Sequence, residues 1–174
     1  EANLPTHAKA AANYLGPAMA AWQARKEGYD EIVMLDEHDH LAEAPTSNVF
    51  VVDAQGTLRT PAVDSVLPGI TRQSMLEVAK HEGIPTYDGV VEAAELPNAR
   101  EAFLSSTSIG VWPIASVDAA PLMASAAMFN CWSMMVAQMV ADATTSAITL
   151  YAETCPISGR PSIRTCWFGT LMAP

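Results

Sequence analysis

The sequence is poor in basic residues. Across its 174 residues, 9 Lys and Arg stand against 19 Asp and Glu, which gives a formal net charge of -10 at pH 7. A chain with this balance repels nucleic-acid phosphates and the anionic surfaces of membranes. We therefore expect neither nucleic acid nor a membrane as a partner.

Cysteines are also few. Cys131, Cys155 and Cys166 form neither a CxxC pair nor an even set. A disulfide framework or a zinc site of the usual spacing is therefore not indicated. Reduced thiols in a cytoplasmic protein are the simpler interpretation.

The start of the chain has no initiator Met and no basic segment followed by an apolar one. A secretory signal peptide would need the second feature. Glu1–Pro5 has the composition of a domain interior, so we expect the sequence to begin at a cut within a longer protein.

Half of the residues are hydrophobic, enough to bury the core of about one domain. Residues 1–118 read as a mixed α/β region of regular elements separated by turns. We expect one helix within 10–27, with Gly16 and Pro17 marking a break or a late start, and a second within 71–82, ended by Gly83. The expected strands cover residues 31–36, 48–53, 101–105 and 110–114.

After Asp118 the composition changes. Residues 119–174 hold four charged side chains, whereas the first 118 residues hold the other 24. The uncharged run 119–141 is long enough for a membrane helix, but a buried or poorly specified Met-rich helix fits its alanines and polar residues better. We expect 119–174 to be an atypical tail, which a frameshift, a gene fusion or an unrelated segment would explain.

Four segments of the first region provide groups that a phosphorylated aldehyde cofactor needs. They are Lys9–Tyr14 (KAAANY), Leu41–Phe50 (LAEAPTSNVF), Leu67–Arg72 (LPGITR) and Phe103–Gly110 (FLSSTSIG). In order and spacing they resemble the large-domain motifs of class IV (fold type IV) pyridoxal-phosphate aminotransferases, the group of branched-chain, D-amino-acid and R-amine transaminases. The resemblance implies a mixed α/β (α+β) domain whose strands form a pseudo-barrel flanked by helices.

Lys9 matches the Schiff-base lysine of that family, whose amine also moves a proton during transamination. Taken alone, a lysine is usually a solvated surface charge. The alanine-rich surroundings suggest partial burial, which would lower the pKa of the amine and favour its attack on an aldehyde.

Two further residues match groups that contact the cofactor ring. By resemblance, the phenol of Tyr14 bonds the ring oxygen and Glu43 pairs with the pyridine nitrogen. A protonated ring withdraws electrons from the substrate, so a carboxylate at this place serves the chemistry. Without the resemblance, Tyr14 is an ordinary half-buried tyrosine and Glu43 a solvated strand end. Asn48 is expected to fix the loop that follows it.

In so acidic a chain the phosphate should be held by backbone amides and hydroxyls. Gly69 permits close approach of the backbone, and Ile70 and Thr71 open a helix whose free N–H groups attract an anion. The alternative for Thr71 is a helix cap. Resemblance adds Leu67 to this set.

The last motif adds hydroxyl groups. By resemblance the hydroxyl of Thr107 also binds the phosphate, while Ser106 and Ser108 line the substrate side and Arg72 has a structural role. His38 and His40 could be metal ligands, but their spacing within a polar turn is more typical of a hairpin loop.

The resemblance implies an enzyme that moves an amino group between an amino acid or amine and a 2-oxo acid, with pyridoxal 5'-phosphate as cofactor, as a homodimer. Family members carry a small N-terminal domain before the lysine, and this sequence has no counterpart of it before Lys9. The alternatives are therefore a lyase similar to aminodeoxychorismate lyase, or a non-catalytic remnant or interaction domain.

Overall fold

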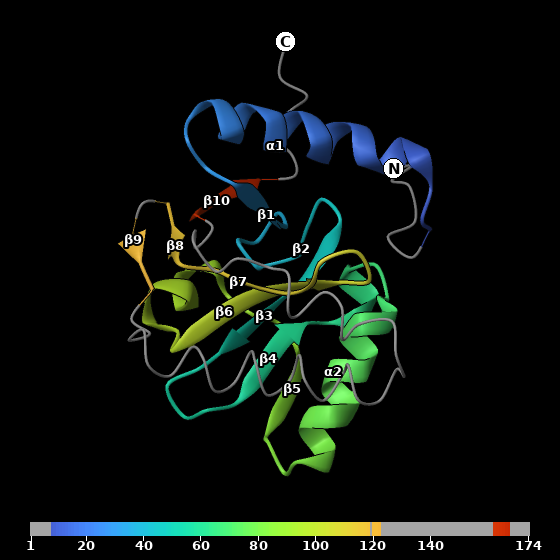
Figure 1. Cartoon of the computed structure of the whole chain (residues 1–174), viewed down its shortest axis with the longest axis vertical. Coiled ribbons are helices and arrows are strands. Elements are labelled where there is room, and N and C mark those ends of the chain that lie inside the picture. Colours follow the sequence, from blue (N-terminus) through green and yellow to red (C-terminus); the bar gives the residue numbers. More distant parts are fainter. Residues whose placement is uncertain (1–7, 119, 123–161, 168–174) are drawn as a thin grey trace.

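The computed structural model describes residues 8–118, 120–122 and 162–167, the last segment by its backbone alone. These residues form two β-sheets and two α-helices (Figure 1). The expected run 119–141 and most of the expected tail lie outside the described residues. Within the described part, no helix is long and apolar enough to cross a membrane.

The larger sheet has the strand order β5-β4-β3-β6-β7, with the short β2 paired to β3. Its pairs are antiparallel except β4 with β5. The strands are β2 (Glu43–Ala44), β3 (Ser47–Val52), β4 (Leu58–Pro61), β5 (Thr86–Gly89), β6 (Glu101–Ser106) and β7 (Gly110–Pro113).

The smaller sheet has the order β1-β10-β8-β9. Its strands are β1 (Glu31–Leu35), β8 (Ser116–Val117), β9 (Ala120–Pro121) and β10 (Ser162–Trp167). β10 pairs in parallel with both β1 and β8. A segment from the expected tail thus lies inside a sheet of the main domain.

Helix α1 (Leu15–Lys26) covers the outer face of the smaller sheet, above β1 in Figure 1. A short 3-10 turn, η1 (Ala11–Tyr14), leads into it. Pro17 lies in the first turn of α1, where a backbone N–H would have no partner inside the helix, so the late start is confirmed. Ala21 and Ala24 pack on Ile32 and Met34.

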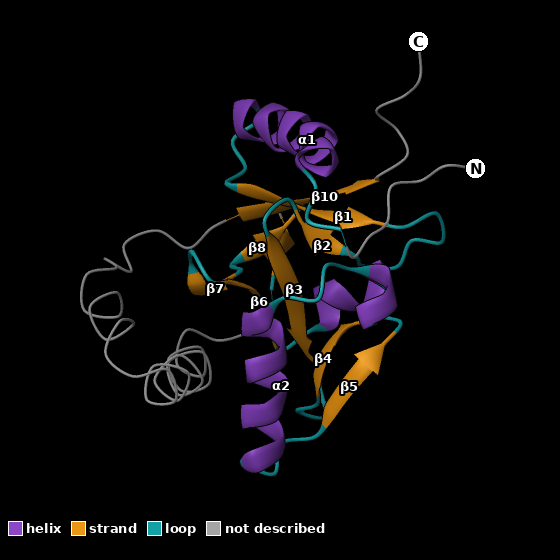
Figure 2. Cartoon of the chain, turned by 90° about the vertical axis from the view of Figure 1, so that its right-hand side faces the viewer, coloured by secondary structure: helices purple, strands orange, loops and turns teal. Residues whose placement is uncertain are grey.

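Helix α2 (Ile70–His81) packs against β5 and β6 of the larger sheet, below α1 in Figure 2. Met75 and Ala79 are buried against Phe50 and Phe103, and the two rings stack at 5.1 Å. Gly83 follows the helix with φ 71°, which confirms the predicted glycine end.

The main core lies between the two sheets. Val33 and Leu35 of β1 face Val49 and Val51 of β3 and Leu104 of β6 within one buried cluster. Because side chains alternate along a strand, the opposite faces of the same strands receive α1 and α2. Two sheets around a shared core, with the helices outside, confirm the mixed α/β class.

The predicted strands are confirmed as β1, β3, β6 and β7. The turn predicted around His38 and His40 is present, and an antiparallel bridge between Leu35 and Leu41 closes it. β1 and β3 belong to different sheets. The chain leaves β1 through a turn in which the His40 carbonyl accepts the Asp36 N–H, and it then crosses to the larger sheet.

Candidate functional site

A row of polar residues crosses the larger sheet beside the start of α2. Glu43 of β2 is in register with Asn48 of β3, which is in register with Ser105 of β6. All three lie on the face that carries Phe50 and Phe103 and that α2 covers. The row therefore lies next to the segment that leads into this helix.

The segment 67–71, which we call the cradle loop, is attached to this row. The Glu43 Oε2 atom accepts the N–H of Leu67 at 3.1 Å, and Asn48 Nδ2 donates to the carbonyl oxygen of Leu67 at 2.9 Å. Both peptide groups of Leu67 are thereby fixed to neighbouring strands. Asn48 is expected to fix the loop that follows it, whereas this contact is with the cradle loop, 19 positions further along the chain.

Gly69 allows the loop to approach the sheet closely. A Cβ atom added at Gly69 would lie 2.2 Å from Asn48 Oδ1. No real Cβ contact is so short, so a larger residue would push the loop away from Asn48. The close approach predicted for Gly69 is present, and the group that Gly69 approaches is the Asn48 side chain.

The start of α2 is open to an anion. Gly69 precedes the helix, and no side chain caps it. The hydroxyl of Thr71 is therefore not used as a helix cap. The N–H groups of Ile70 and Thr71 belong to the first turn, where they have no partner within the helix.

Two groups of the polar row retain bonding capacity. Glu43 is half-buried, and burial raises its pKa above the ordinary value, although the Leu67 N–H opposes the rise. In the described part of the chain, its Oε1 atom receives no hydrogen bond. Ser105 is fully buried, and its Oγ has no hydrogen-bond partner there.

The hairpin between β6 and β7 carries the other predicted hydroxyls. Ser106 and Gly110 close it, and Gly110 adopts φ 64°. Ser106 Oγ and Ser108 Oγ lie 3.0 Å apart, and Thr107 between them is exposed. In Figure 1 this hairpin lies on the same side of the molecule as the upper end of α2, where the helix begins.

Lys9 and Tyr14 form a separate group before and at the start of α1. The Asn13 side chain donates to the Ala8 carbonyl oxygen at 2.9 Å, and the Ala10 N–H donates to the same oxygen. Lys9 is exposed, so the predicted partial burial is wrong for this chain; the alanines around it are too small to cover its long side chain. No hydrogen bond or ion pair among the described residues joins Lys9 or Tyr14 to the cradle loop.

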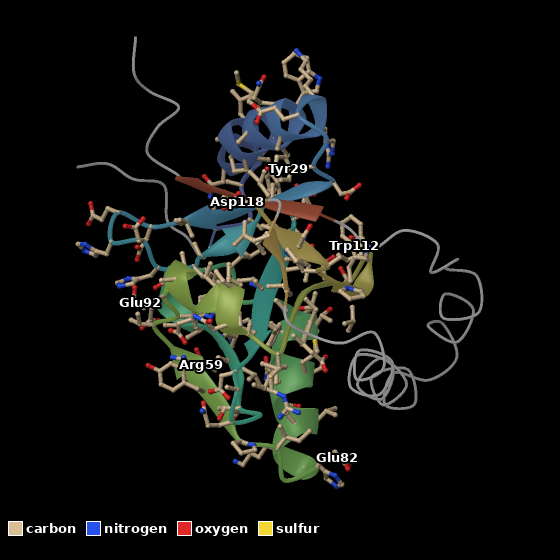
Figure 3. All side chains as sticks on the ribbon, turned by 90° about the vertical axis from the view of Figure 1, so that its left-hand side faces the viewer. Tyr29, Arg59, Glu82, Glu92, Trp112 and Asp118 are labelled. Atoms are coloured by element: carbon tan, nitrogen blue, oxygen red, sulfur yellow. The ribbon has the colours of Figure 1, made fainter. Side chains whose placement is uncertain are left out.

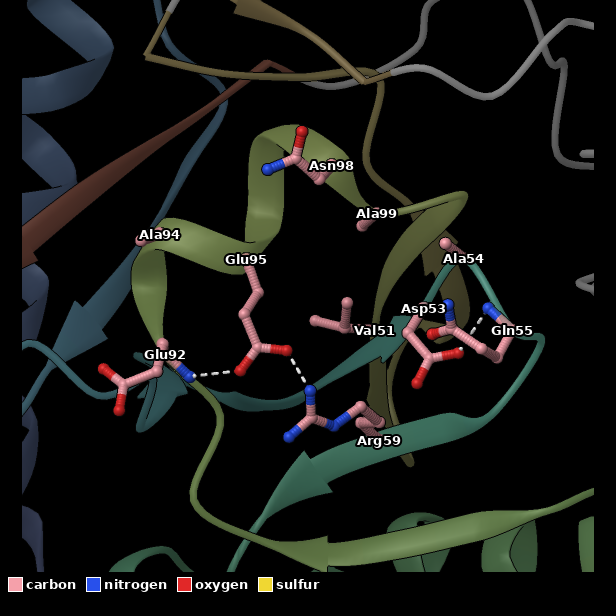
Figure 4. A pocket seen from close by; sticks show the side chains of 10 residues that line it. All are labelled: Val51, Asp53, Ala54, Gln55, Arg59, Glu92, Ala94, Glu95, Asn98 and Ala99. Atoms are coloured by element: carbon pink, nitrogen blue, oxygen red, sulfur yellow. Dashed lines mark hydrogen bonds and ion pairs between the residues drawn. The ribbon is translucent and has the colours of Figure 1, made fainter.

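A shallow pocket of about 370 Å³ lies elsewhere, beside β4 and the 3-10 helix η3 (Ala93–Asn98). Its floor carries an ion pair between Arg59 and Glu95, whose side chains point toward each other in Figure 4. Figure 3 shows Arg59 and Glu92 on the same side of the molecule. None of the predicted site residues lines this pocket.

Sequence reasoning missed Ser105 because it lies within a strand motif beside three more obvious hydroxyl residues. It also missed the contacts of Arg72, which is buried at the start of α2. The signal in the sequence was an arginine directly after the predicted anion-binding turn. An exposed cation is the simplest expectation at that position, whereas Arg72 is buried.

A half-buried carboxylate, a buried serine hydroxyl and an uncapped helix start thus lie together on one face of the larger sheet. The family model for amino-transferase class IV matches residues 1–117. The chain belongs to this family, and the predicted family and fold class are confirmed.

Curated relatives agree with this assignment. Over 115 residues the chain is 36% identical to a branched-chain-amino-acid aminotransferase of Escherichia coli (strain K12), covering 66% of this chain and 37% of that protein. A probable branched-chain-amino-acid aminotransferase of Rickettsia felis is 35% identical over 114 residues, with 66% and 39% covered. The chain thus spans less than two fifths of the length of these relatives.

Solved structures match over a larger share of the chain. A branched-chain amino acid aminotransferase from Escherichia coli matches with a TM-score of 0.72 and 33% identity, covering 79% of this chain and 46% of that one. The enzyme of Thermoproteus uzoniensis, with norvaline, gives a TM-score of 0.70 and 34% identity over 78% and 44%. The enzyme of Thermobaculum terrenum, in its PLP-form, gives 0.72 and 32% over 79% and 46%.

Proposed function

We propose that this chain is the pyridoxal-phosphate-binding part of a class IV aminotransferase, which exchanges an amino group between an amino acid and a 2-oxo acid. The observation that carries the proposal is the attachment of Leu67 to both Glu43 and Asn48 beside the uncapped start of α2. Family membership and a related structure in its PLP-form support it.

The residues of the cradle loop fit a phosphate. The N–H groups of Ile70 and Thr71 and the hydroxyl of Thr71 would hold it at the positive end of the α2 dipole. The exposed hydroxyl of Thr107 would add a donor from the β6–β7 hairpin. Backbone N–H groups and hydroxyls can hold a phosphate without additional basic residues, which suits a chain that has few of them.

The residues beside the loop fit the rest of the cofactor. Pyridoxal phosphate supplies an electron sink for the bond that breaks at the substrate. Glu43 would hold a proton at the pyridine nitrogen through its available Oε1, and Tyr14 would bond the ring oxygen. Lys9 would bind the cofactor aldehyde covalently and move the substrate proton.

The substrate and assembly belong to the same proposal. The named relatives act on branched-chain amino acids, so we propose an apolar amino acid as donor, with Ser106 and Ser108 on the substrate side. We also propose residues 1–118 as the cofactor-binding region, a homodimer and a cytoplasmic location.

A labelling experiment tests the cofactor site. The purified chain is mixed with pyridoxal phosphate and reduced with borohydride, and the modified lysine is mapped by mass spectrometry. The chain has three lysines, Lys9, Lys26 and Lys80, so the expected result is a label on Lys9 that Lys9→Ala abolishes and Lys80→Ala preserves. Absence of label, or label spread over all three, contradicts the proposal.

A second candidate function is a non-catalytic cofactor-binding domain, favoured by the exposure of Lys9. A turnover assay with leucine and 2-oxoglutarate separates the two, because only a transaminase forms glutamate. A lyase similar to aminodeoxychorismate lyase would instead release pyruvate from aminodeoxychorismate. Labelling of Lys9 without any turnover would support the non-catalytic domain.

A further inference from the structure

Arg72 is a buried cation at the third position of α2. It is 4% exposed, and its Nη2 atom donates to the Pro61 carbonyl oxygen at 2.8 Å and to Asp88 Oδ1 at 2.6 Å. Its Nε is buried without a partner among the described residues. Burying a guanidinium is costly, and a single ion pair rarely compensates fully. A purely stabilising role is therefore a poor explanation for this residue.

The partners of Arg72 belong to two neighbouring strands. Pro61 is the last residue of β4, and Asp88 lies in β5, where it is in register with Thr60. Arg72 thus attaches the first turn of α2 to the β4–β5 edge of the sheet. Pro61 and Arg72 are eleven positions apart, and the cradle loop begins between them.

The opposite end of the cradle loop is held independently. Glu43 and Asn48 fix Leu67 to β2 and β3, whereas Arg72 fixes the helix start to β4 and β5. The N–H groups of Ile70 and Thr71 lie between these two attachments. A binding group held on both sides loses little conformational entropy when the ligand arrives.

We propose that Arg72, through Pro61 and Asp88, is a positioning residue that fixes the direction of the first N–H groups of α2 toward a phosphate. The guanidinium itself is directed at the sheet edge and does not bind the phosphate. This inference rests on the proposed function, in which the start of α2 receives the phosphate of pyridoxal phosphate.

The phosphate gives a sharp test, because pyridoxal has the same ring and aldehyde without it. Equilibrium dialysis measures the dissociation constants of pyridoxal phosphate and of pyridoxal for the full chain and for Arg72→Lys. Lysine keeps the charge, but its side chain is one bond shorter than the path to Nη2, so the ammonium falls short of the two partners that Nη2 bonds. We expect pyridoxal phosphate to bind about tenfold more weakly to Arg72→Lys, and pyridoxal to bind about equally.

Asp88→Asn provides a second variant if Arg72→Lys fails to fold, because the Asp88 side chain is 40% exposed. The variant removes a negative charge, which by charge alone would tighten phosphate binding. The positioning role predicts the opposite, a loss of about threefold for pyridoxal phosphate only. The matched control is Arg59→Lys. Arg59 lies on β4, as Pro61 does, but pairs with Glu95 of η3, so this variant should change neither dissociation constant.

The outcomes separate the two proposals. If the unaltered chain does not bind pyridoxal phosphate, the proposed function fails and this inference fails with it. If it binds, but both variants retain their affinity or Asp88→Asn binds more tightly, only the positioning role is overturned. A parallel loss for pyridoxal phosphate and pyridoxal would also overturn it, since that result indicates general disruption of the site.

Discussion

Glu101 is a buried carboxylate outside the candidate site. It lies at the start of β6 with 4% exposure, and its Oε2 atom has no hydrogen-bond partner among the described residues. Burial raises its pKa from 4.5 to about 6, while the neighbouring Arg100 lowers it by a smaller amount. Compared with the unfolded chain, the folded chain holds the proton of this group more tightly and releases it at a higher pH.

We predict that Glu101→Gln stabilises the chain at neutral pH. The raised pKa favours the wild-type fold below pH 4.5, and this contribution disappears as the pH rises through about 6. The variant should gain on the order of 1–2 kcal/mol in unfolding free energy at pH 7 and little at pH 4. Urea midpoints from pH 4 to 8 measure the effect, with exposed Glu37→Gln as control. A gain that does not change with pH would contradict the prediction.

The role proposed for Glu43 is one that a glutamine cannot perform. The amide oxygen of Glu43→Gln can still accept the Leu67 N–H, so we expect the cradle loop to stay in place and Lys9 to be labelled. Without the carboxylate, proton abstraction should slow by at least about tenfold. Single-turnover absorbance with leucine measures this rate, and Glu77→Gln, on the exposed side of α2, is the control. Unchanged transamination would refute the role of Glu43.

At the scale of elements, the helices and the β2–β3, β3–β4 and β6–β7 pairs follow local signals, whereas β1 pairs with the distant β10. The start of α1 at Leu15 and the end of α2 before Gly83 agree with proline and glycine chemistry. β1 and β3 follow one another in the sequence but belong to different sheets, and both are buried on two faces. A doubly buried strand carries little information about its neighbour in the sheet.

Gly16 offers a test of the α1 start. It lies in the first turn of the helix with a negative φ, and an added Cβ would meet no atom within 4 Å. Gly16→Ala should therefore stabilise the chain by about 0.5–1 kcal/mol. Gly83→Ala is the matched contrast, since φ 71° strains an alanine and should destabilise the chain. Thermal melts of both variants measure the effects, and a loss in Gly16→Ala would show that this turn is not helical.

At the scale of the whole molecule, the smaller sheet depends on a distant part of the sequence. β10 pairs with all five residues of β1 and also with β8. Without β10 these two strands would have no connection within the sheet. The separate origin expected for 119–174 stays a prediction, which sequencing the gene around the Asp118 codon addresses.

We predict that removing residues 162–174 destabilises the chain by roughly 3–6 kcal/mol, at about 1 kcal/mol for each backbone hydrogen bond lost. Removing only 168–174 keeps β10 and is the control. Hydrogen exchange of the β1 amides should accelerate in the first variant and not in the second. Equal protection in both would mean that β10 does not support β1.

The sequence by itself determined the family, the two helices and the strands β1, β3, β6 and β7, and it predicted most of the candidate site residues. These are motif and periodicity signals that act over a few residues. Tertiary structure alone decided that Ser105 joins Glu43 and Asn48, that Arg72 reaches Pro61 and Asp88, that Lys9 is exposed, and that β10 enters the smaller sheet. Such contacts depend on strand register and on the crossing of distant segments, which no local pattern encodes.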